Sequence, residues 1–291
     1  MSRRGLFLFI LVGFLWGIPY LFIKVAVDPD NGFSPAIVVC LRTAIGAAIL
    51  IPIAIKQRQL FAAVRGWRYV GAYAFLEMIG PWILIGTAEQ KISSGLAGLL
   101  VASVPIWATI FASMRGDKTV WQRKRLFGIV VGFIGLIAVV GIESITGSAD
   151  PLSIAMVLVA SIGYSYAVMM VQSALPHVSG IAINAVAMAM TAIFYLPWTI
   201  AQWPTHEISQ GAIRAIIGLG VLSTGAAFAA FFTLANIIGV ARGSLVTYLN
   251  TAFAVVLGVI ILKEPLTTGI ILGLPLVLIG SYFASRKPAD A

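Results

Sequence analysis

Polar and aromatic side chains recur at helical spacing within otherwise apolar stretches of this sequence. Residues three or four apart lie on one face of a helix, and polar groups within an apolar bundle usually face other helices or water. Rings that bury apolar parts, beside hydroxyls that fix orientation, suit a small amphiphilic solute. Packing is the alternative, since hydroxyls also bond back to their own helix. The four faces comprise Trp16, Tyr20 and Lys24; Tyr73 and Glu77; Ser161, Tyr164 and Ser165; and Ser244, Thr247, Tyr248 and Thr251.

Ten apolar stretches fill nearly all of the 291 residues, which are 60% hydrophobic and 10% charged with a mean hydropathy of +1.02. A helix needs about 20 apolar residues to cross a bilayer. The sequence therefore predicts an all-α polytopic membrane protein with ten transmembrane helices. The expected spans are 5–27, 34–55, 68–88, 92–114, 125–142, 151–173, 178–201, 212–236, 241–262 and 266–285.

Arg42 and Glu77 are charged residues deep within the second and third spans. At 1.5 Å per helical residue they lie roughly 12 Å and 16 Å from the same membrane surface, whereas Lys24 lies much nearer to it. One interpretation is a structural ion pair between Arg42 and Glu77. The other is that Glu77 binds the ammonium of an amino-acid solute, or carries a proton that exchanges with it.

Four residues are expected to interrupt or loosen spans: Pro19, Pro81, Pro105 and Gly163. Proline removes a backbone donor and kinks a helix, and non-helical backbone at membrane depth is tolerated only inside protein or beside water. Paired weak points in corresponding helices are typical of transporter binding sites. Kinks that serve packing are the alternative.

The charges of the links predict that both termini are cytoplasmic, because Lys and Arg concentrate on cytoplasmic loops. The net charge of +9 then reflects topology and contact with anionic lipid rather than nucleic-acid binding. The inner links hold Arg3, Arg4, Lys56, Arg58, Arg65, Arg68, Arg115, Lys118, Arg123, Lys124, Arg125, Arg242, Arg286 and Lys287. The outer links hold Lys91, Arg214 and Lys263 beside Asp28, Asp30, Glu89, Glu143, Asp150, Glu207 and Glu264.

Chemistry other than transport finds little support in the residues. The histidines, His177 and His206, are expected at opposite membrane surfaces, and no nucleophile–base pair or phosphate-binding glycine loop is visible. The single cysteine, Cys40, offers neither a disulfide nor a thiolate metal site. We expect no enzyme activity, no metal and no cofactor. A channel is the remaining rival, although no repeated ring of charged residues is evident.

The second half of the chain weakly repeats the first, which divides it into five-helix units at 1–146 and 147–291. Because five is odd, the second unit would enter the membrane from the opposite side, giving the inverted repeat on which many secondary transporters are built. Glycines four residues apart in spans five and ten predict close helix packing. The matches are Gly95 with Gly243, Gly128 and Gly132 with Gly269 and Gly273, and Trp16-Gly17 with Ile162-Gly163.

Two such units, with Leu15-Trp16-Gly17 in the first helix and glycine-spaced fifth and tenth helices, resemble the EamA-type branch of the drug/metabolite transporter superfamily. Lys263-Glu264-Pro265 also resembles the acidic motif that follows the ninth helix in many members, whereas Arg115-Gly116-Asp117 in the first half is less regular. The resemblance covers roughly residues 5–285. It implies a ten-helix exporter or exchanger of small metabolites, in the branch that includes YddG-type bacterial amino-acid exporters.

The sequence thus predicts an alternating-access carrier in the inner membrane of a bacterium. It would export small amphiphilic metabolites, most of all neutral and aromatic amino acids. Multidrug efflux and metabolite uptake or exchange are the alternatives within transport. The expected partners are the solute and the lipid bilayer, and not nucleic acid.

Overall fold

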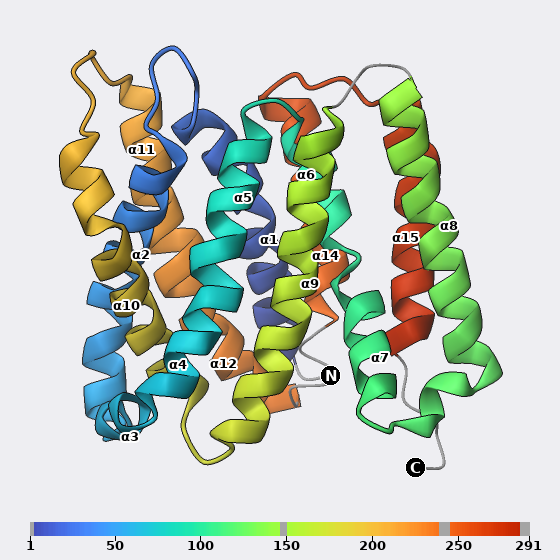
Figure 1. The fold of residues 1–291 in the computed structure, drawn as a ribbon, viewed down its shortest axis with the longest axis horizontal. Coiled ribbons are helices and arrows are strands. Elements are labelled where there is room, and N and C mark those ends of the chain that lie inside the picture. Colours follow the sequence, from blue (N-terminus) through green and yellow to red (C-terminus); the bar gives the residue numbers. More distant parts are fainter. Residues whose placement is uncertain (1–2, 146–149, 239–244, 286–291) are drawn as a thin grey trace.

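The computed structural model describes residues 3–145, 150–238 and 245–285, and all regular structure within these ranges is helical (Figure 1). The first half contains α1 (Arg3–Ala26), α2 (Pro35–Lys56), α3 (Leu60–Arg65), α4 (Trp67–Ala74), η1 (Phe75–Ile79), α5 (Gly80–Glu89), α6 (Ser94–Val101), α7 (Val104–Met114), η2 (Lys118–Trp121) and α8 (Arg123–Ile145). The second half contains α9 (Pro151–Ala174), α10 (Gly180–Ala201), α11 (Gln210–Gly218), η3 (Leu219–Ala226), α12 (Ala227–Ile238), α14 (Val246–Ile261) and α15 (Thr268–Ser285).

Eight helical runs in the described ranges are long and apolar enough to cross a membrane, so the chain is a multi-pass membrane protein. They correspond to the first eight predicted spans. The ninth and tenth predicted spans are represented by two shorter apolar helices, Val246–Ile261 and Thr268–Ala284. The beginning of the predicted span 241–262 lies outside the described residues. Many large apolar side chains are exposed along the helices, as expected for surfaces that face lipid.

Short polar residues in the links define where several helices begin. Ser93, Ser179 and Ser209 each accept a hydrogen bond from the backbone N–H three residues later. Asp150 does the same for α9, and its bonds from the Ser153 amide and hydroxyl hold the pKa of the Asp150 carboxyl below its ordinary value. Such caps satisfy a backbone donor that has no partner within the helix.

Three of the predicted spans are interrupted. The third and the eighth each contain a π-helical segment, η1 and η3 respectively, and the fourth breaks between α6 and α7 just before Pro105. Pro81 lies directly after η1, at the start of α5. In contrast, α1 remains helical through Pro19 and α9 through Gly163, so neither residue ends its helix, and the kink or loosening expected there stays a prediction. Single π-helical turns occur often at functional sites.

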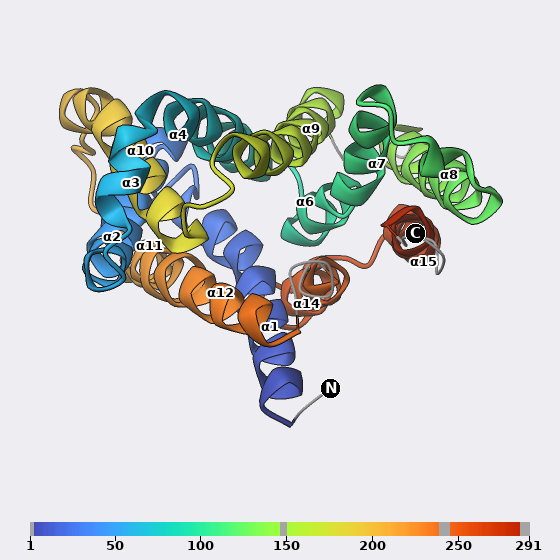
Figure 2. The same cartoon turned by 90° about the horizontal axis from the view of Figure 1, so that it is seen from below.

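Packing between the halves pairs spans with the same position in each half. The pairs α2–α10, α8–α15 and α6–α14 all make extensive contacts. The third span contacts the sixth through α5 and α9, and the eighth span contacts the first through α11, α12 and α1. Each span therefore has the same neighbours when the first and second halves are exchanged. Figure 2 shows the α8–α15 pair at one edge of the bundle and the α2–α10 pair at the other.

Glycines bring α8 and α15 into backbone contact. A Cβ atom added to Gly280 would lie 2.2 Å from the Gly132 nitrogen and 2.7 Å from the Gly128 carbonyl oxygen. The predicted packing role of Gly128 and Gly132 therefore has a direct geometric basis. Gly273 likewise approaches Val139 of α8, whereas the importance of Gly280 was not foreseen from the sequence.

Replacing Gly280 with alanine should force α8 and α15 apart. We expect Gly280→Ala to destabilise the protein by about 1–3 kcal/mol, the usual cost of overpacking, because the new methyl group meets backbone atoms that cannot move aside. Thermal denaturation in detergent would measure the loss. Gly141→Ala is the matched control, since a Cβ at Gly141 meets nothing within 4 Å. Equal effects of the two changes would contradict the packing account.

Candidate functional site

Arg42 of α2 is buried where α2 meets α5 and the π-helical segment η3. Its side chain is 5% exposed, and its guanidinium carbon stands 3.7 Å from the centre of the Trp82 ring of α5. One guanidinium nitrogen donates to the Thr224 hydroxyl of η3 over 3.2 Å, and the Arg42 Nε has no partner. The aromatic face supplies a cation–π interaction. These contacts hold the guanidinium plane without neutralising its charge.

Glu77 does not pair with Arg42, which corrects the sequence-based hypothesis of an ion pair. The ion pairs within the described ranges are Lys91 with Asp150 at 3.8 Å and Arg125 with Asp117 at 3.1 Å. Glu77 lies in η1, and its Oε2 atom is buried without a hydrogen-bond partner. A buried polar atom that has no partner is costly. Glu77 therefore holds a buried acceptor that no donor in the described ranges satisfies.

Tyr164 of α9 interacts electrostatically with both of these charged groups. It lies within electrostatic range of both Arg42 and Glu77. The neighbouring Gly163 brings α9 close to η1, because a Cβ there would stand 2.7 Å from the Leu76 carbonyl oxygen. Gly163 thus permits close packing of α9 against η1. Arg42, Glu77 and Tyr164 therefore belong to one interior region of the bundle, the Arg42 group.

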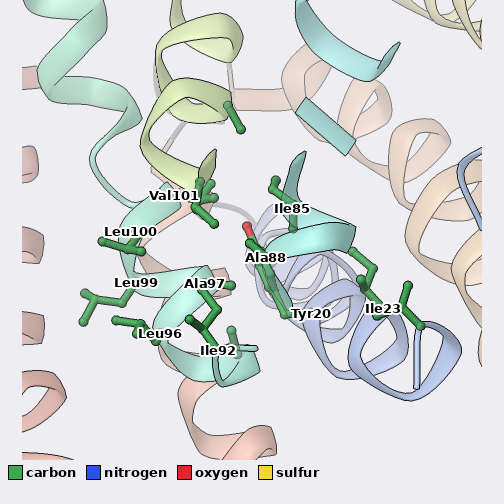
Figure 3. Packing of buried hydrophobic residues seen from close by; sticks show 14 of the residues in the cluster. Tyr20, Ile23, Ile85, Ala88, Ile92, Leu96, Ala97, Leu99, Leu100 and Val101 are labelled. Atoms are coloured by element: carbon green, nitrogen blue, oxygen red, sulfur yellow. The ribbon is translucent and has the colours of Figure 1, made fainter. Parts of the chain in front are cut away.

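Tyr20 of α1 lies in the same region as Arg42 and Tyr164. It is 8% exposed and lies within electrostatic range of Arg42 and of Tyr164. Figure 3 shows Tyr20 beside Ala88 of α5, with the apolar side chains of α6 close by. The prediction that Tyr20 and Tyr164 face a common interior is consistent with this arrangement.

Three predicted pathway hydroxyls bond to the interrupted fourth span instead. Ser161 and Ser165 bond back to carbonyls four residues earlier in α9, as the packing interpretation proposed. They also donate to the Leu100 and Val104 carbonyls, over 3.4 Å and 2.9 Å. Thr251 of α14 donates to the carbonyl of Thr247 over 3.0 Å and of Gly98 over 3.5 Å. Their contacts satisfy backbone carbonyls near the break before Pro105.

The other predicted pathway residues in the described ranges have neighbours of their own, and Tyr73 also lies within electrostatic range of Glu77 and Tyr164. Trp16 packs on the rings of Phe228 and Phe231 of α12, and Tyr73 donates to the Asn184 side chain over 3.1 Å. The Tyr248 ring lies 6.2 Å from that of Tyr282 on α15. Thr247 lies one helical turn before Thr251 on α14, and Ser244 lies outside the described residues.

A second polar group lies at the upper end of the bundle in Figure 1, where α1 ends. A pocket of about 310 Å³ is lined there by Lys24, Glu89 and Glu264 among others. The Lys24 amine donates to the backbone carbonyls of Glu89 and Ile92 over 2.5 Å and 2.8 Å. Glu264 accepts hydrogen bonds from the Ser94 amide, the Ser94 hydroxyl and the Gly95 amide at the start of α6. A carboxylate at a helix N-terminus is well stabilised.

Glu89 corrects the sequence-based view that it belongs to an outer link. It is the last residue of α5, is fully buried, and neither of its carboxylate oxygens has a hydrogen-bond partner. Lys24, Glu264 and Arg42 all lie within electrostatic range. Glu89 therefore lies between the upper pocket and the Arg42 group.

Sequence reasoning also missed Trp82 and Thr224. Trp82 follows Pro81 by one position, and a tryptophan within a span is usually interpreted as packing or as an interface residue. Thr224 lies in a stretch of small and apolar residues that gives no sign of a π-helical turn. A signal did exist at Thr224, because Ser223-Thr224 is a polar pair in the middle of an apolar span.

Comparison with known proteins decides the family. The model of the EamA-like transporter family matches residues 3–141 and again residues 151–286. The chain belongs to the EamA-like transporter family. The uncharacterized transporter YoaV of Bacillus subtilis is 26% identical over 96% of this chain and 97% of its own length. The uncharacterized inner membrane transporter YedA of Escherichia coli K12 is 23% identical over 95% of this chain and 91% of its own.

A solved crystal structure has the same fold as this EamA-like transporter. It superposes with a TM-score of 0.68 at 15% identity, covering 98% of this chain and 97% of the other. The family assignment identifies the protein as a transporter. Within the described ranges, His, Cys, Asp and Glu residues form no cluster of three or more that could hold a metal ion.

Glu89, which is buried, and Glu264, which is half-buried, should respond differently to neutralisation. Glu264→Gln is expected to destabilise the transporter by roughly 1.5–3 kcal/mol, because the carboxylate accepts three hydrogen bonds. Glu89→Gln is expected to leave stability unchanged or to raise it, because the change removes a carboxylate that lacks such partners. Thermal denaturation of the two purified variants provides the comparison. A larger loss for Glu89→Gln would make Glu89 a structural residue.

Proposed function

We propose that this chain is a secondary transporter that exports small amphiphilic metabolites, chiefly neutral and aromatic amino acids, by alternating access. The observation that carries the proposal is that Arg42 and Glu77 do not pair and that the Arg42 Nε and Glu77 Oε2 atoms are both buried without hydrogen-bond partners in the described ranges. An amino acid is a zwitterion with an apolar side chain, so it needs an opposite charge at each end and apolar or aromatic surroundings. Family membership supports transport, and the site supports this class of solute.

In this proposal Glu77 binds the ammonium group of the solute. Its buried and unpartnered Oε2 atom can accept a hydrogen bond from an ammonium. The π-helical turn η1 supports this role, since such turns are frequent at functional sites. Tyr20 and Tyr164 would cover the apolar part of the solute.

We further propose that the two halves are inverted repeats that exchange access between the two membrane surfaces. Three observations support the repeat. The family model matches each half, and spans at the same position in the two halves pack against each other. The third and eighth spans also both contain a π-helical turn. Inverted repeats place the solute site near the midplane, where their helices are discontinuous. Arg42 and Glu77 contact or occupy these two turns.

The proposed location is the bacterial inner membrane with both termini in the cytoplasm. The similarity to the inner membrane transporter YedA supports the location, and the basic residues of the predicted inner links support the orientation. We expect a single cysteine at Asp28 or Glu207 to react with an impermeant thiol reagent from the periplasm, in a Cys40→Ala background. A cysteine at Lys56 should be protected in intact cells and react after lysis. The reverse pattern would contradict the orientation.

Transport by reconstituted protein tests the proposed function. Liposomes loaded with unlabelled L-phenylalanine or L-leucine should accumulate the labelled amino acid by counterflow, with saturable kinetics. Glu77→Gln should remain folded and lose at least about tenfold in apparent affinity for the amino acid, because a charge-assisted hydrogen bond is worth roughly 1.5–3 kcal/mol. It should not lose affinity for 3-phenylpropionate, which lacks the ammonium group. Absence of flux for a full panel of labelled amino acids would refute amino-acid transport.

Multidrug efflux is the alternative that a specific observation favours. The aromatic cluster of Trp16 with Phe228 and Phe231 offers an apolar surface without charged partners. Flux of a lipophilic cation such as ethidium, with no flux of amino acids, would select this alternative.

A further inference from the structure

The Arg42 guanidinium is a buried cation without a buried anionic partner. Only one of its hydrogen bonds is formed within the described residues, to Thr224, and the Nε atom has none. Thr224 is itself fully buried. Isolated charges within the membrane are costly and are usually paired with each other or with a ligand. The arrangement therefore resembles one half of a buried ion pair.

No acid within the described residues completes that pair. Glu89 lies within electrostatic range of Arg42, but neither of its oxygens accepts a hydrogen bond from any described residue. The ion pairs within the described ranges do not involve Arg42. Tyr20 and Tyr164 are also within range, and both are neutral phenols at ordinary pH.

Resting on the proposed function, we propose that Arg42 binds the carboxylate of the transported solute, while Trp82 and Thr224 act as positioning residues. The guanidinium of arginine presents its donors in a planar fork that matches a carboxylate. Trp82 covers one face of this plane, and the Nε atom at its edge is a buried donor without a hydrogen-bond partner in the described ranges, which a solute carboxylate would complete. Thr224 accepts a hydrogen bond from another nitrogen of the guanidinium and fixes its rotation.

The charge balance favours a monoanionic carboxylate over a phosphate. A single guanidinium neutralises one negative charge, whereas a phosphate monoester carries about 1.5 to 2 at neutral pH. The nearby cation Lys24 already donates to two backbone carbonyls at the end of α5. A solute with one carboxylate therefore fits Arg42 without a second cation.

Close packing of α2 against η3 maintains the site. Gly46, one helical turn after Arg42, faces Thr224 and Met188, and a Cβ there would lie 2.6 Å from Thr224 Cγ2 and 2.8 Å from Met188 Sδ. Any larger residue at Gly46 would push η3 away from α2. The hydrogen bond between Arg42 and Thr224 thus depends on a small residue one turn away.

Competition by paired solutes tests the proposal on the unaltered protein. L-phenylalanine and L-leucine should inhibit counterflow at least about 30-fold more strongly than L-phenylalaninamide and L-leucinamide, which lack the carboxylate. The amides keep the ammonium and the apolar side chain, so the difference reports on the carboxylate alone. Equal inhibition by the acids and their amides would overturn the proposal and leave amino-acid transport standing.

Variants assign the discrimination to Arg42. Arg42→Met should lose the preference for the free acids over the amides, and Arg42→Lys should retain part of it. Arg68→Met is the matched control, since Arg68 stands over a tryptophan ring at 5.7 Å but is exposed at the surface. Wild-type preference in a folded Arg42→Met protein would overturn the proposal. If Arg42→Met does not fold, the comparison of acids with amides on the unaltered protein decides the matter.

Binding to purified protein separates this inference from the proposed function. 3-Phenylpropionate should raise the denaturation temperature of the wild-type protein, and 3-phenylpropionamide should not. If no amino acid is transported but this difference persists, the function is wrong and the carboxylate site stands. If amino acids are transported and no difference between carboxylates and amides appears, only the carboxylate site is refuted.

Discussion

A positive charge held inside an apolar bundle is the constraint on which this structure depends. Arg42 is 5% exposed and lies against Trp82 and Thr224 instead of a carboxylate. The free-energy cost of burying this charge must be offset by the packing around Arg42, or by a ligand that forms an ion pair with it. The aromatic ring and the hydroxyl reduce the cost without cancelling the charge. A protein that moves charged solutes needs such incomplete pairs, because a site that is fully satisfied has no use for a ligand.

Interrupted helices create this environment. The π-helical turns η1 and η3 present Glu77 and Thr224 to the interior, and the break in the fourth span exposes backbone carbonyls. In hydrocarbon those carbonyls need partners. Ser161 and Ser165 of α9 provide some of them, as does Ser281 of α15, which donates to the Ala102 carbonyl over 2.8 Å. The hydroxyl stripes thus stabilise the broken span, while Arg42 and Glu77 each keep a buried polar atom without a partner in the described ranges.

The sequence was sufficient for the membrane class, the family and the first eight spans, because hydropathy and glycine spacing depend on the chain alone. It also identified Arg42 and Glu77 as unusual, since charge within a span is rare. The sequence did not predict how Arg42 and Glu77 lie relative to each other. Depth along a helix can be counted from the sequence, but the direction a side chain faces depends on π-helical turns that change the rotation of the helix. The pairing of Arg42 with Trp82 and Thr224 joins α2, α5 and η3, and no local pattern reveals it.

The position of a bound amino acid tests this account most directly. A cryo-electron microscopy structure of the transporter in lipid nanodiscs with L-phenylalanine would locate the solute relative to the Arg42 group. The account expects the solute carboxylate within hydrogen-bond distance of the Arg42 guanidinium, its ammonium toward Glu77, and Tyr164 between the two ends. A solute bound elsewhere, with Arg42 paired to Glu77 or Glu89, would contradict it.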